Sequence, residues 1–292
     1  MILFPTIICS KENTVKEYIL MDNRPIGVFD SGVGGLTAVR ALLRDYPNES
    51  IVYFGDTARV PYGNRDKDDI TNLSLQDVRF LRSKGVKAVL IACNTITCNA
   101  GEELSADNPD VPVVGTVDAA AAAAAAATKN GRIGIIATAA TVRSAAYDAA
   151  LKAINPEFQV FSQGCPKLVP LIESNHILPG DALIEEAAAE YLAPLKAEGV
   201  DVVILGCTHY PLIAQVVANY MGEDVALIDS GAESAKAIIK TLTETDGLAE
   251  KDAAAEVNYY CSARLGDFET IAQVFLSKDI HGSAYEINIE EY

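Results

Sequence analysis

Two segments of this chain share one pattern, in which a short apolar run ends at a cysteine. The segments read VLIACNTIT around Cys93 and VVILGCTHYPL around Cys207. Each run is too short for anything but a buried strand, so each cysteine is expected at the C-terminal end of a strand. Ligands of α/β sheets bind at those ends, where backbone N–H groups and hydroxyls favour reactive thiols. Two such thiols predict a site with two reactive faces.

The spacing of the surrounding segments indicates a duplicated unit. The interval from Asp30, which closes PIGVFD, to Cys93 is close to the interval from Thr138, which closes RIGIIAT, to Cys207. The apolar runs between these landmarks, IVYFG and FQVFSQG, also fall at matching positions. Self-similarity of this kind is typical of a repeated unit. We therefore expect two similar β-α-β-α-β modules that face one cleft; the alternative is a chance alignment of short apolar runs.

Strand-like and helical stretches alternate through the middle of the chain. This alternation predicts an α/β fold with two doubly wound parallel sheets, each covered by helices on both faces. The expected strands, most of them short Val and Ile runs, lie at 26–30, 51–55, 88–92, 112–115, 132–137, 158–162, 201–206 and 225–228.

An alanine run marks the passage between the two modules. The nine alanines at 119–127 follow Asp118, a good N-cap, and predict a helix start. The tail beyond the last strand is expected to return to the first module, because neither half is otherwise complete. The expected units are an N-terminal extension at 1–21, a first domain at 22–116 plus 229–292, and a second domain at 117–228.

Composition limits the partners and the compartment. The chain has 292 residues, of which 50% are hydrophobic, enough for the cores of two domains. Its formal net charge of −17 argues against nucleic acid or an anionic membrane surface as a partner. Six cysteines spread over a chain of this length do not suggest a disulfide framework, and no apolar run is long enough to span a membrane. We expect a cytoplasmic protein with reduced thiols.

The glycine-rich segment SGVGGLT follows Asp30 and predicts a tight turn into an amphipathic helix, with Ser31 as its cap. Helix starts of this kind favour anions. The glycine spacing departs from G-x-G-x-x-G in its full context, and no Lys-Ser/Thr pair follows Gly35 as in a P-loop. A nucleotide is therefore not expected.

Four segments together resemble the signature segments of the glutamate racemases, in the aspartate/glutamate racemase family. In order, they read GVFDSGVGGLT, YFGDTARVPYGNR, IACNTITCNA and ILGCTHYPLI. The resemblance implies two pseudo-symmetric α/β domains with the active site in the cleft between them. It also implies interconversion of L-glutamate and D-glutamate without a cofactor, which supplies D-glutamate for peptidoglycan biosynthesis. A homodimer is an option that the resemblance leaves open.

Racemisation of an amino acid without a cofactor requires two bases. One base removes the α-proton from one face while an acid delivers a proton to the other face. Cys93 and Cys207 fit this arrangement, one beginning as thiolate and the other as thiol, and the resemblance gives both that role. The carbanion-like transition state then needs preorganised donors nearby.

The resemblance assigns roles to the neighbours of the two thiols. Asp30 is placed to assist Cys93, and His209 is placed to assist Cys207. Contacts with the substrate are expected from Asp30, Ser31, Tyr62, Gly63, Asn94, Thr95, Thr138, Thr141, Glu173, Thr208 and His209.

Simpler interpretations remain for several of these residues. Asp30 could only cap the following helix, Tyr62 could only pack, and Glu173 could be a solvated helix residue. Cys9, Cys98, Cys165 and Cys261 are expected to be inert core residues. A metal site is not expected, because the chain has no CxxC and only three histidines.

Three other functions stay open at this point. Aspartate racemases and related two-cysteine enzymes share the expected architecture, although THY after Cys207 and the DSGVGG and PYG segments favour glutamate. A non-catalytic module that closes its two domains on an amino acid would have the same outline. A metal-binding regulator is the third alternative.

Overall fold

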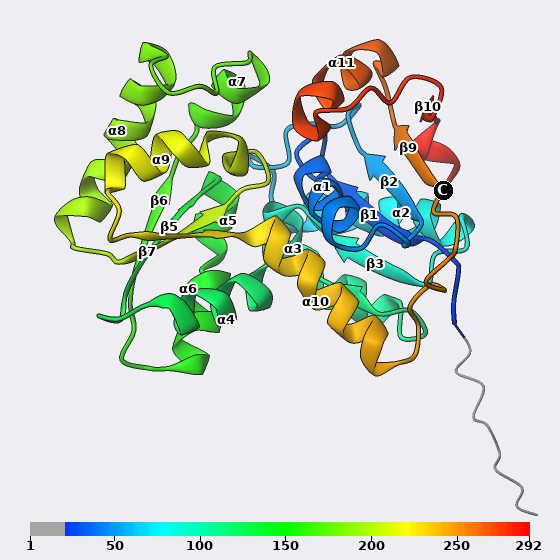
Figure 1. The fold of residues 1–292 in the computed structure, drawn as a ribbon, viewed down its shortest axis with the longest axis horizontal. Helices are drawn as coiled ribbons and strands as arrows, with labels where there is room; N and C mark the ends of the chain where they lie inside the picture. The colour runs from blue at the N-terminus through cyan, green and yellow to red at the C-terminus, as the bar shows by residue number, and fades with distance from the viewer. Residues whose placement is uncertain (1–20) are drawn as a thin grey trace, which may run out of the picture.

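The computed structural model describes residues 21–292, so the expected extension at 1–21, except Met21, and Cys9 lie outside the described residues. Two parallel sheets form the centre of the molecule (Figure 1). Sheet A has the order β10-β9-β2-β1-β3-β4, and sheet B has the order β6-β5-β7-β8. The strands are β1 (Ile26–Asp30), β2 (Ile51–Gly55), β3 (Ala88–Ile91), β4 (Val113–Val114), β5 (Arg132–Ala137), β6 (Gln159–Gly164), β7 (Val202–Gly206), β8 (Ala226–Asp229), β9 (Val257–Cys261) and β10 (Ala284–Glu286).

Every strand pair in both sheets is parallel, which confirms the predicted fold class. The eight expected strands are all present, with ends that differ from the prediction by at most two residues. The central strands β1, β2 and β7 are buried along their whole length. Burial on both faces explains why these strands are continuous Val, Ile and Phe runs rather than alternating patterns.

Helices cover both faces of each sheet, and one helix joins the two halves. Helix α10 packs against α1 on one side and α4 on the other, between the two halves (Figure 1). The helices are α1 (Leu36–Asp45), α2 (Lys67–Ser83), α3 (Asn94–Asp107), α4 (Val117–Ala127), α5 (Ala139–Ser144), α6 (Ala146–Ile154), α7 (Leu168–Glu173), α8 (Ala182–Ala197), α9 (Ala214–Met221), α10 (Ser230–Glu244) and α11 (Leu265–Leu276), with short 3₁₀ helices at Tyr210–Ile213 and Ile289–Glu291.

Two predicted helix caps are wrong. Helix α1 begins at Leu36 with Gly35 as its N-cap, so Ser31 does not cap it and instead lies in the turn before the helix. Helix α4 begins at Val117 with Thr116 as its N-cap, which places Asp118 in the first turn. Neither observed N-cap residue makes a side-chain cap hydrogen bond.

The tail adds two strands to sheet A that were not among the expected strands. Strand β9 pairs with β2, and β10 pairs with β9 as the edge of the sheet. The predicted domain boundaries remain a prediction, while the topology puts β1–β4, β9 and β10 in one sheet and β5–β8 in the other. No helix within residues 21–292 is long and apolar enough to cross a membrane.

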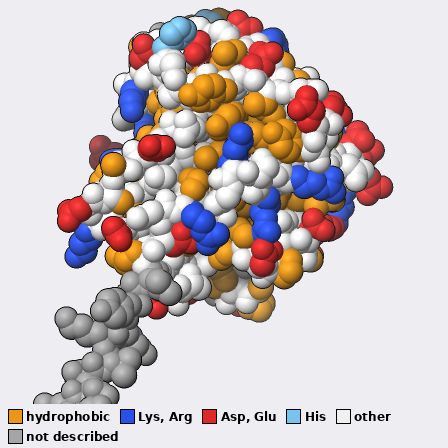
Figure 2. Space-filling model, turned by 90° about the vertical axis from the view of Figure 1, so that its right-hand side faces the viewer, with side chains coloured by type: hydrophobic (Ala, Val, Ile, Leu, Met, Phe, Trp, Pro, Cys, Tyr) orange, Lys and Arg blue, Asp and Glu red, His pale blue; other side chains and the backbone are white. Residues whose placement is uncertain are grey.

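The end of the molecule that carries β10 has a mixed surface. Figure 2 views this side and shows hydrophobic side chains gathered near the middle of the face, with charged side chains among and around them. Tyr285 on the edge strand is 45% exposed. The homodimer stays a prediction.

Candidate active site

A cavity of about 410 Å³ lies where the C-terminal ends of the two sheets meet. Residues from both sheets line it, including Cys93 after β3 and Cys207 after β7. All of the predicted site residues except Thr141 line this cavity. The sequence analysis missed further lining residues at Gly32, Val60, Pro61, Asn64, Ala139, Cys165, Pro166, Val169 and Pro170.

Cys93 lies at the N-terminus of α3. It is the N-cap of that helix and 5% exposed, and its thiol donates a hydrogen bond to Ser31 Oγ at 3.6 Å. Burial, and then the charge of Asp30, raise the pKa of the Cys93 thiol well above its ordinary value. The first backbone N–H groups of α3 favour negative charge at this position. A thiolate at Cys93 is therefore a strong base in a buried position.

Asp30 ends β1, the strand next to β3. Its side chain is almost fully buried, and Oδ2 accepts a hydrogen bond from the Gly32 N–H at 3.0 Å. Burial raises the pKa of the Asp30 carboxyl, while the charge of His209 lowers it. Its other oxygen, Oδ1, has no hydrogen-bond partner within residues 21–292. A buried carboxylate oxygen without a partner in a cavity wall is available to a ligand or to the neighbouring thiol.

Cys207 and His209 form the opposite wall. His209 Nδ1 is 3.9 Å from Cys207 Sγ, and Nε2 is 3.0 Å from Glu173 Oε1. Burial disfavours the imidazolium, but the hydrogen bonds to Cys207 and Glu173 outweigh burial and raise the pKa of His209 to about 10. The same hydrogen bond from His209 lowers the pKa of Glu173. Glu173 therefore acts on His209, which differs from the solvated helix residue of the simpler interpretation.

Replacing Glu173 with glutamine should shift the pH profile of the enzyme. The hydrogen bonds to Cys207 and to Glu173 together raise the pKa of His209 to about 10, and an imidazolium there stabilises negative charge in the cavity. Without this carboxylate the pKa of His209 falls, so the proton is lost earlier as the pH rises. We expect the alkaline limb of kcat/KM to move to lower pH by about one unit or more in Glu173→Gln.

The matched control for this shift is Glu190→Gln. The side chain of Glu190, in α8, is exposed to a degree similar to that of Glu173. It forms an ion pair with Lys167, the N-cap of α7. Its replacement should leave the profile where it is in the parent protein. An unchanged alkaline limb in Glu173→Gln would show that Glu173 does not control His209.

The two halves approach each other closely beside this wall. A Cβ atom at Gly34 would lie 2.1 Å from Thr208 Oγ1 and 2.6 Å from His209 Nδ1, so only glycine fits there. Thr37 Oγ1 donates to the Thr208 carbonyl at 3.0 Å, and the ring of Phe275 in α11 packs edge-on against the His209 ring. The turn after β1 and the C-terminal tail thus both hold the His209 side of the cavity.

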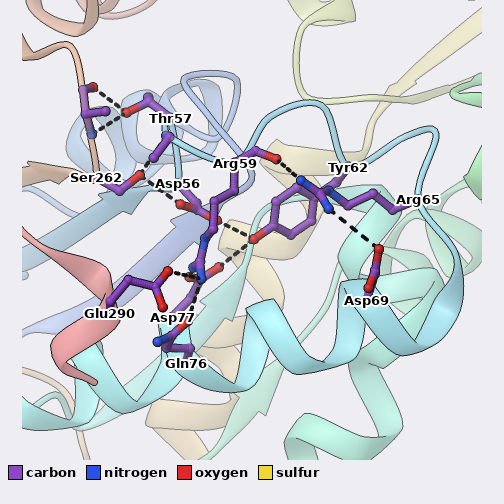
Figure 3. Close-up of polar contacts among 12 residues, drawn as sticks. Asp56, Thr57, Arg59, Tyr62, Arg65, Asp69, Gln76, Asp77, Ser262 and Glu290 are labelled. Atoms are coloured by element: carbon purple, nitrogen blue, oxygen red, sulfur yellow. Dashed lines mark hydrogen bonds and ion pairs between the residues drawn. The ribbon is translucent and has the colours of Figure 1, made fainter.

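Tyr62 lines the cavity, but its hydroxyl is bonded within the protein. Its hydroxyl donates to Asp56 and lies 3.4 Å from Asp77 Oδ2, so it points toward these two carboxylates (Figure 3). The Arg59 guanidinium completes this group, at 2.6 Å from Asp56 and 2.8 Å from Asp77. A buried ion cluster therefore holds the segment 60–64 in the cavity wall.

Replacing Arg59 with glutamine should destabilise the fold strongly. The change leaves Asp56 and Asp77, both fully buried, without their cation. Removing one partner of a buried ion pair costs about 3–5 kcal/mol. We expect that loss in urea unfolding of Arg59→Gln.

Arg24→Gln is the comparison, because Arg24 pairs with Asp22 at the surface. An exposed pair of this kind contributes about 0–1 kcal/mol. Equal small losses in the two variants would contradict a structural role for the Arg59 cluster.

A row of threonine hydroxyls joins the two halves across the cavity. Thr95 Oγ1 and Thr138 Oγ1 are 3.0 Å apart, and Thr138 Oγ1 donates to Thr141 Oγ1 at 3.0 Å. Thr141 is buried and supports Thr138 rather than lining the cavity. Thr208 Oγ1 is 3.5 Å from His209 Nδ1. Thr95, Thr138 and Thr208 line the cavity together with the two thiols, so a small polar ligand would find hydrogen-bonding partners there.

The remaining cysteines divide into two kinds. Cys98 lies on α3 beyond the cavity, and Cys261 is buried in β9. Cys165, expected to be only a core residue, is buried but also lines the cavity. Within the part of the chain that the structure describes, no group of three or more His, Cys, Asp and Glu side chains is arranged to hold a metal ion.

Two parallel-sheet α/β halves, each presenting a cysteine to one shared cavity, define a two-domain α/β enzyme of the amino-acid racemase class, an isomerase. The model of the Asp/Glu/hydantoin racemase family matches residues 30–238. The chain belongs to this family.

Named relatives agree with this assignment. A glutamate racemase from Streptococcus suis is 44% identical over 270 residues, covering 91% of this chain and all of that protein. A crystal structure of glutamate racemase from Francisella tularensis in complex with D-glutamate has a TM-score of 0.85 at 34% identity, covering 93% of this chain and 100% of that chain. A glutamate racemase isoform from Bacillus anthracis has a TM-score of 0.86 at 34% identity, covering 91% and 98%.

Proposed function

We propose that this protein interconverts L-glutamate and D-glutamate by a two-base mechanism without a cofactor, and that Cys93 and Cys207 are the two bases. The observation that carries this proposal is the pair of thiols that reach one cavity from the strand ends of two different sheets. The three relatives named above are glutamate racemases, which supports glutamate as the substrate. As the resemblance implies, the product D-glutamate would serve peptidoglycan biosynthesis.

The proton transfers follow from this arrangement. The thiolate of one cysteine takes the α-proton from one face of glutamate, and the electron pair left on Cα is delocalised into the carboxylate. The thiol of the other cysteine then protonates Cα from the opposite face, so the configuration inverts and the two sulfurs exchange protonation states. The next turnover starts with the roles reversed, or after the newly formed thiol loses its proton to solvent and the other sulfur gains one.

The neighbouring groups would stabilise the charge that develops. The N-terminus of α3 favours negative charge beside Cys93, and the imidazolium of His209 favours it beside Cys207. Asp30 Oδ1 would accept a proton from the Cys93 thiol or a hydrogen bond from the substrate ammonium group. Ser31, Thr95, Thr138, Thr208 and the backbone at Tyr62, Gly63 and Asn94 would bind the two carboxylates.

The proposal also covers the cellular location of the protein and the kind of partner it binds. The mechanism requires both thiols to be reduced, which supports a location in the cytoplasm. The cavity is of a size for a small amino acid, so the partner is a small molecule.

The proposal is tested by following the α-proton of L-glutamate by NMR in D2O together with circular dichroism. We expect the proton signal to be lost while the optical activity decays to zero, starting from either enantiomer. L-aspartate, run in parallel, tests the alternative substrate. If glutamate shows no α-proton exchange and no loss of optical activity, the proposal is overturned. Tight glutamate binding without exchange would indicate a binding module.

A further inference from the structure

A buried cluster of hydrogen bonds surrounds the side chain of Asn94. This residue follows Cys93 as the first residue of α3 and is 2% exposed. Its Oδ1 accepts hydrogen bonds from Thr116 Oγ1 at 3.0 Å and from the Tyr147 hydroxyl. Its Nδ2 donates to Ser230 Oγ at 3.1 Å. Three segments that are distant in the sequence thus meet on one amide group.

The donors and acceptors of this cluster allow one arrangement. The Ser230 hydroxyl donates to the Leu205 carbonyl at 2.8 Å, so its oxygen is the acceptor for Asn94 Nδ2. Both lone pairs of Asn94 Oδ1 are used by the two hydroxyl donors. A buried network in which the polar groups are satisfied is rigid. The Asn94 side chain is therefore held in one orientation in the cavity wall.

The cluster connects the two thiols through a short path. On one side, Asn94 is bonded directly to Cys93 in the chain. On the other side, Leu205 lies in β7 two residues before Cys207. Ser230, the first residue of α10, bridges these ends. Two hydroxyls hold the Oδ1 atom of the Asn94 amide. One belongs to Tyr147, in α6 on the sheet B side, and the other to Thr116, the N-cap of α4.

We propose that Tyr147 and Ser230 are positioning residues that hold Cys93 and Cys207 at a fixed separation through the side chain of Asn94. This inference rests on the proposed two-thiol function. Both thiols must reach the same Cα from opposite faces, so their separation sets the geometry of both proton transfers. A misplacement of 1 Å in such a geometry costs about a hundredfold in rate.

The variant Tyr147→Phe tests this role, because it keeps the buried ring and removes only the hydroxyl. We expect kcat to fall by about ten- to a hundredfold in both directions, with KM for glutamate almost unchanged. The isotope effect with α-deuterated glutamate should increase, because proton transfer limits the rate more strongly. Ser230→Ala should have the same effects, since it breaks the bridge at its other end.

Tyr259→Phe is the matched control. Tyr259 lies in β9 and is 1% exposed, and its hydroxyl has no hydrogen-bond partner within residues 21–292. The substitution removes the same atom from a buried ring without breaking this bridge, so kcat and the isotope effect should stay at the parent values. If Tyr147→Phe lowers only the melting temperature and leaves kcat and the isotope effect unchanged, Tyr147 is merely structural and the inference is overturned.

A second measurement does not depend on activity. A bifunctional thiol reagent of the length that bridges Cys93 and Cys207 in the parent is applied to all variants, and the bridged peptides are quantified by mass spectrometry. We expect a changed yield in Tyr147→Phe and Ser230→Ala and the parent yield in Tyr259→Phe. Equal yields in all proteins overturn the inference. A parent protein that exchanges no α-proton overturns the proposed function instead.

Discussion

Replacing Cys93 or Cys207 with serine should lower kcat for racemisation by about a thousandfold or more. A positioned acid or base contributes about 10²–10⁴ to the rate, and each thiol acts once as base and once as acid. Serine keeps the size of the side chain, but its hydroxyl is a far weaker acid than a thiol. Loss of optical activity by circular dichroism, with either enantiomer as the starting material, measures the effect.

Cys93→Ser and Cys207→Ser should differ in which enantiomer of glutamate still exchanges its α-proton. Each thiol lies on its own side of the cavity, so it abstracts the α-proton from one enantiomer only. Residual exchange of the α-proton with D2O should therefore favour one enantiomer in Cys93→Ser and the other enantiomer in Cys207→Ser. NMR of both enantiomers with both variants checks this prediction.

Cys98→Ser provides the control, because Cys98 is five residues from Cys93 on the same helix yet does not line the cavity. It should keep the rate of the parent protein. Racemisation near the parent rate in either Cys93→Ser or Cys207→Ser would rule out the two-thiol mechanism.

Asp30→Asn should lower kcat/KM by about a hundredfold. The substitution keeps the shape of the side chain and the acceptor for the Gly32 N–H, because asparagine makes the same local hydrogen bond. What it removes is the negative charge at Oδ1, the buried oxygen without a partner in the described chain. If Asp30 were only a turn-forming residue, asparagine would be harmless, so steady-state kinetics distinguishes the two roles.

Asp181→Asn makes the comparison direct. Asp181 caps α8 and accepts the N–H of Leu183 at 3.0 Å, which is the same two-residue pattern that joins Asp30 and Gly32. Asp181 does not line the cavity. Its replacement should leave kcat/KM unchanged, and a similar small effect in Asp30→Asn would remove Asp30 from the chemistry.

The strands and the two thiols were predictable because both depend on local patterns. Short apolar runs of Val and Ile are long enough only for buried strands, and a parallel sheet collects the residues after its strands at one edge. This is why Cys93, Cys207, Asp30 and Thr138 meet at one cavity. The repeat in the sequence added that the edges of two sheets would face each other.

The directions of individual side chains were not predictable in the same way. Tyr62 turns its hydroxyl into the wall because Asp56 and Asp77, one of them from α2, are its partners. The side-chain amide of Asn94 forms hydrogen bonds with Tyr147 and Ser230, which are far away in the sequence. Such orientations are decided by contacts between elements, and a pattern along one chain segment contains no information about them.

The pairing of β9 with β2 has a consequence for synthesis of the protein. Sheet B is built from one continuous stretch of chain, so the nascent polypeptide can complete it before translation ends. Sheet A remains open along β2 until the last part of the chain leaves the ribosome, because β9 is the strand that pairs with β2 there. Two side-chain hydrogen bonds also cross this late junction: Ser262 Oγ accepts from the Ala58 N–H, and Thr57 Oγ1 accepts from the Ala263 N–H. Domains generally fold as units during synthesis. Here the half that carries Cys93, although encoded first, is completed last, and a transcript truncated near its end would yield a protein with a finished second half and an unfinished first.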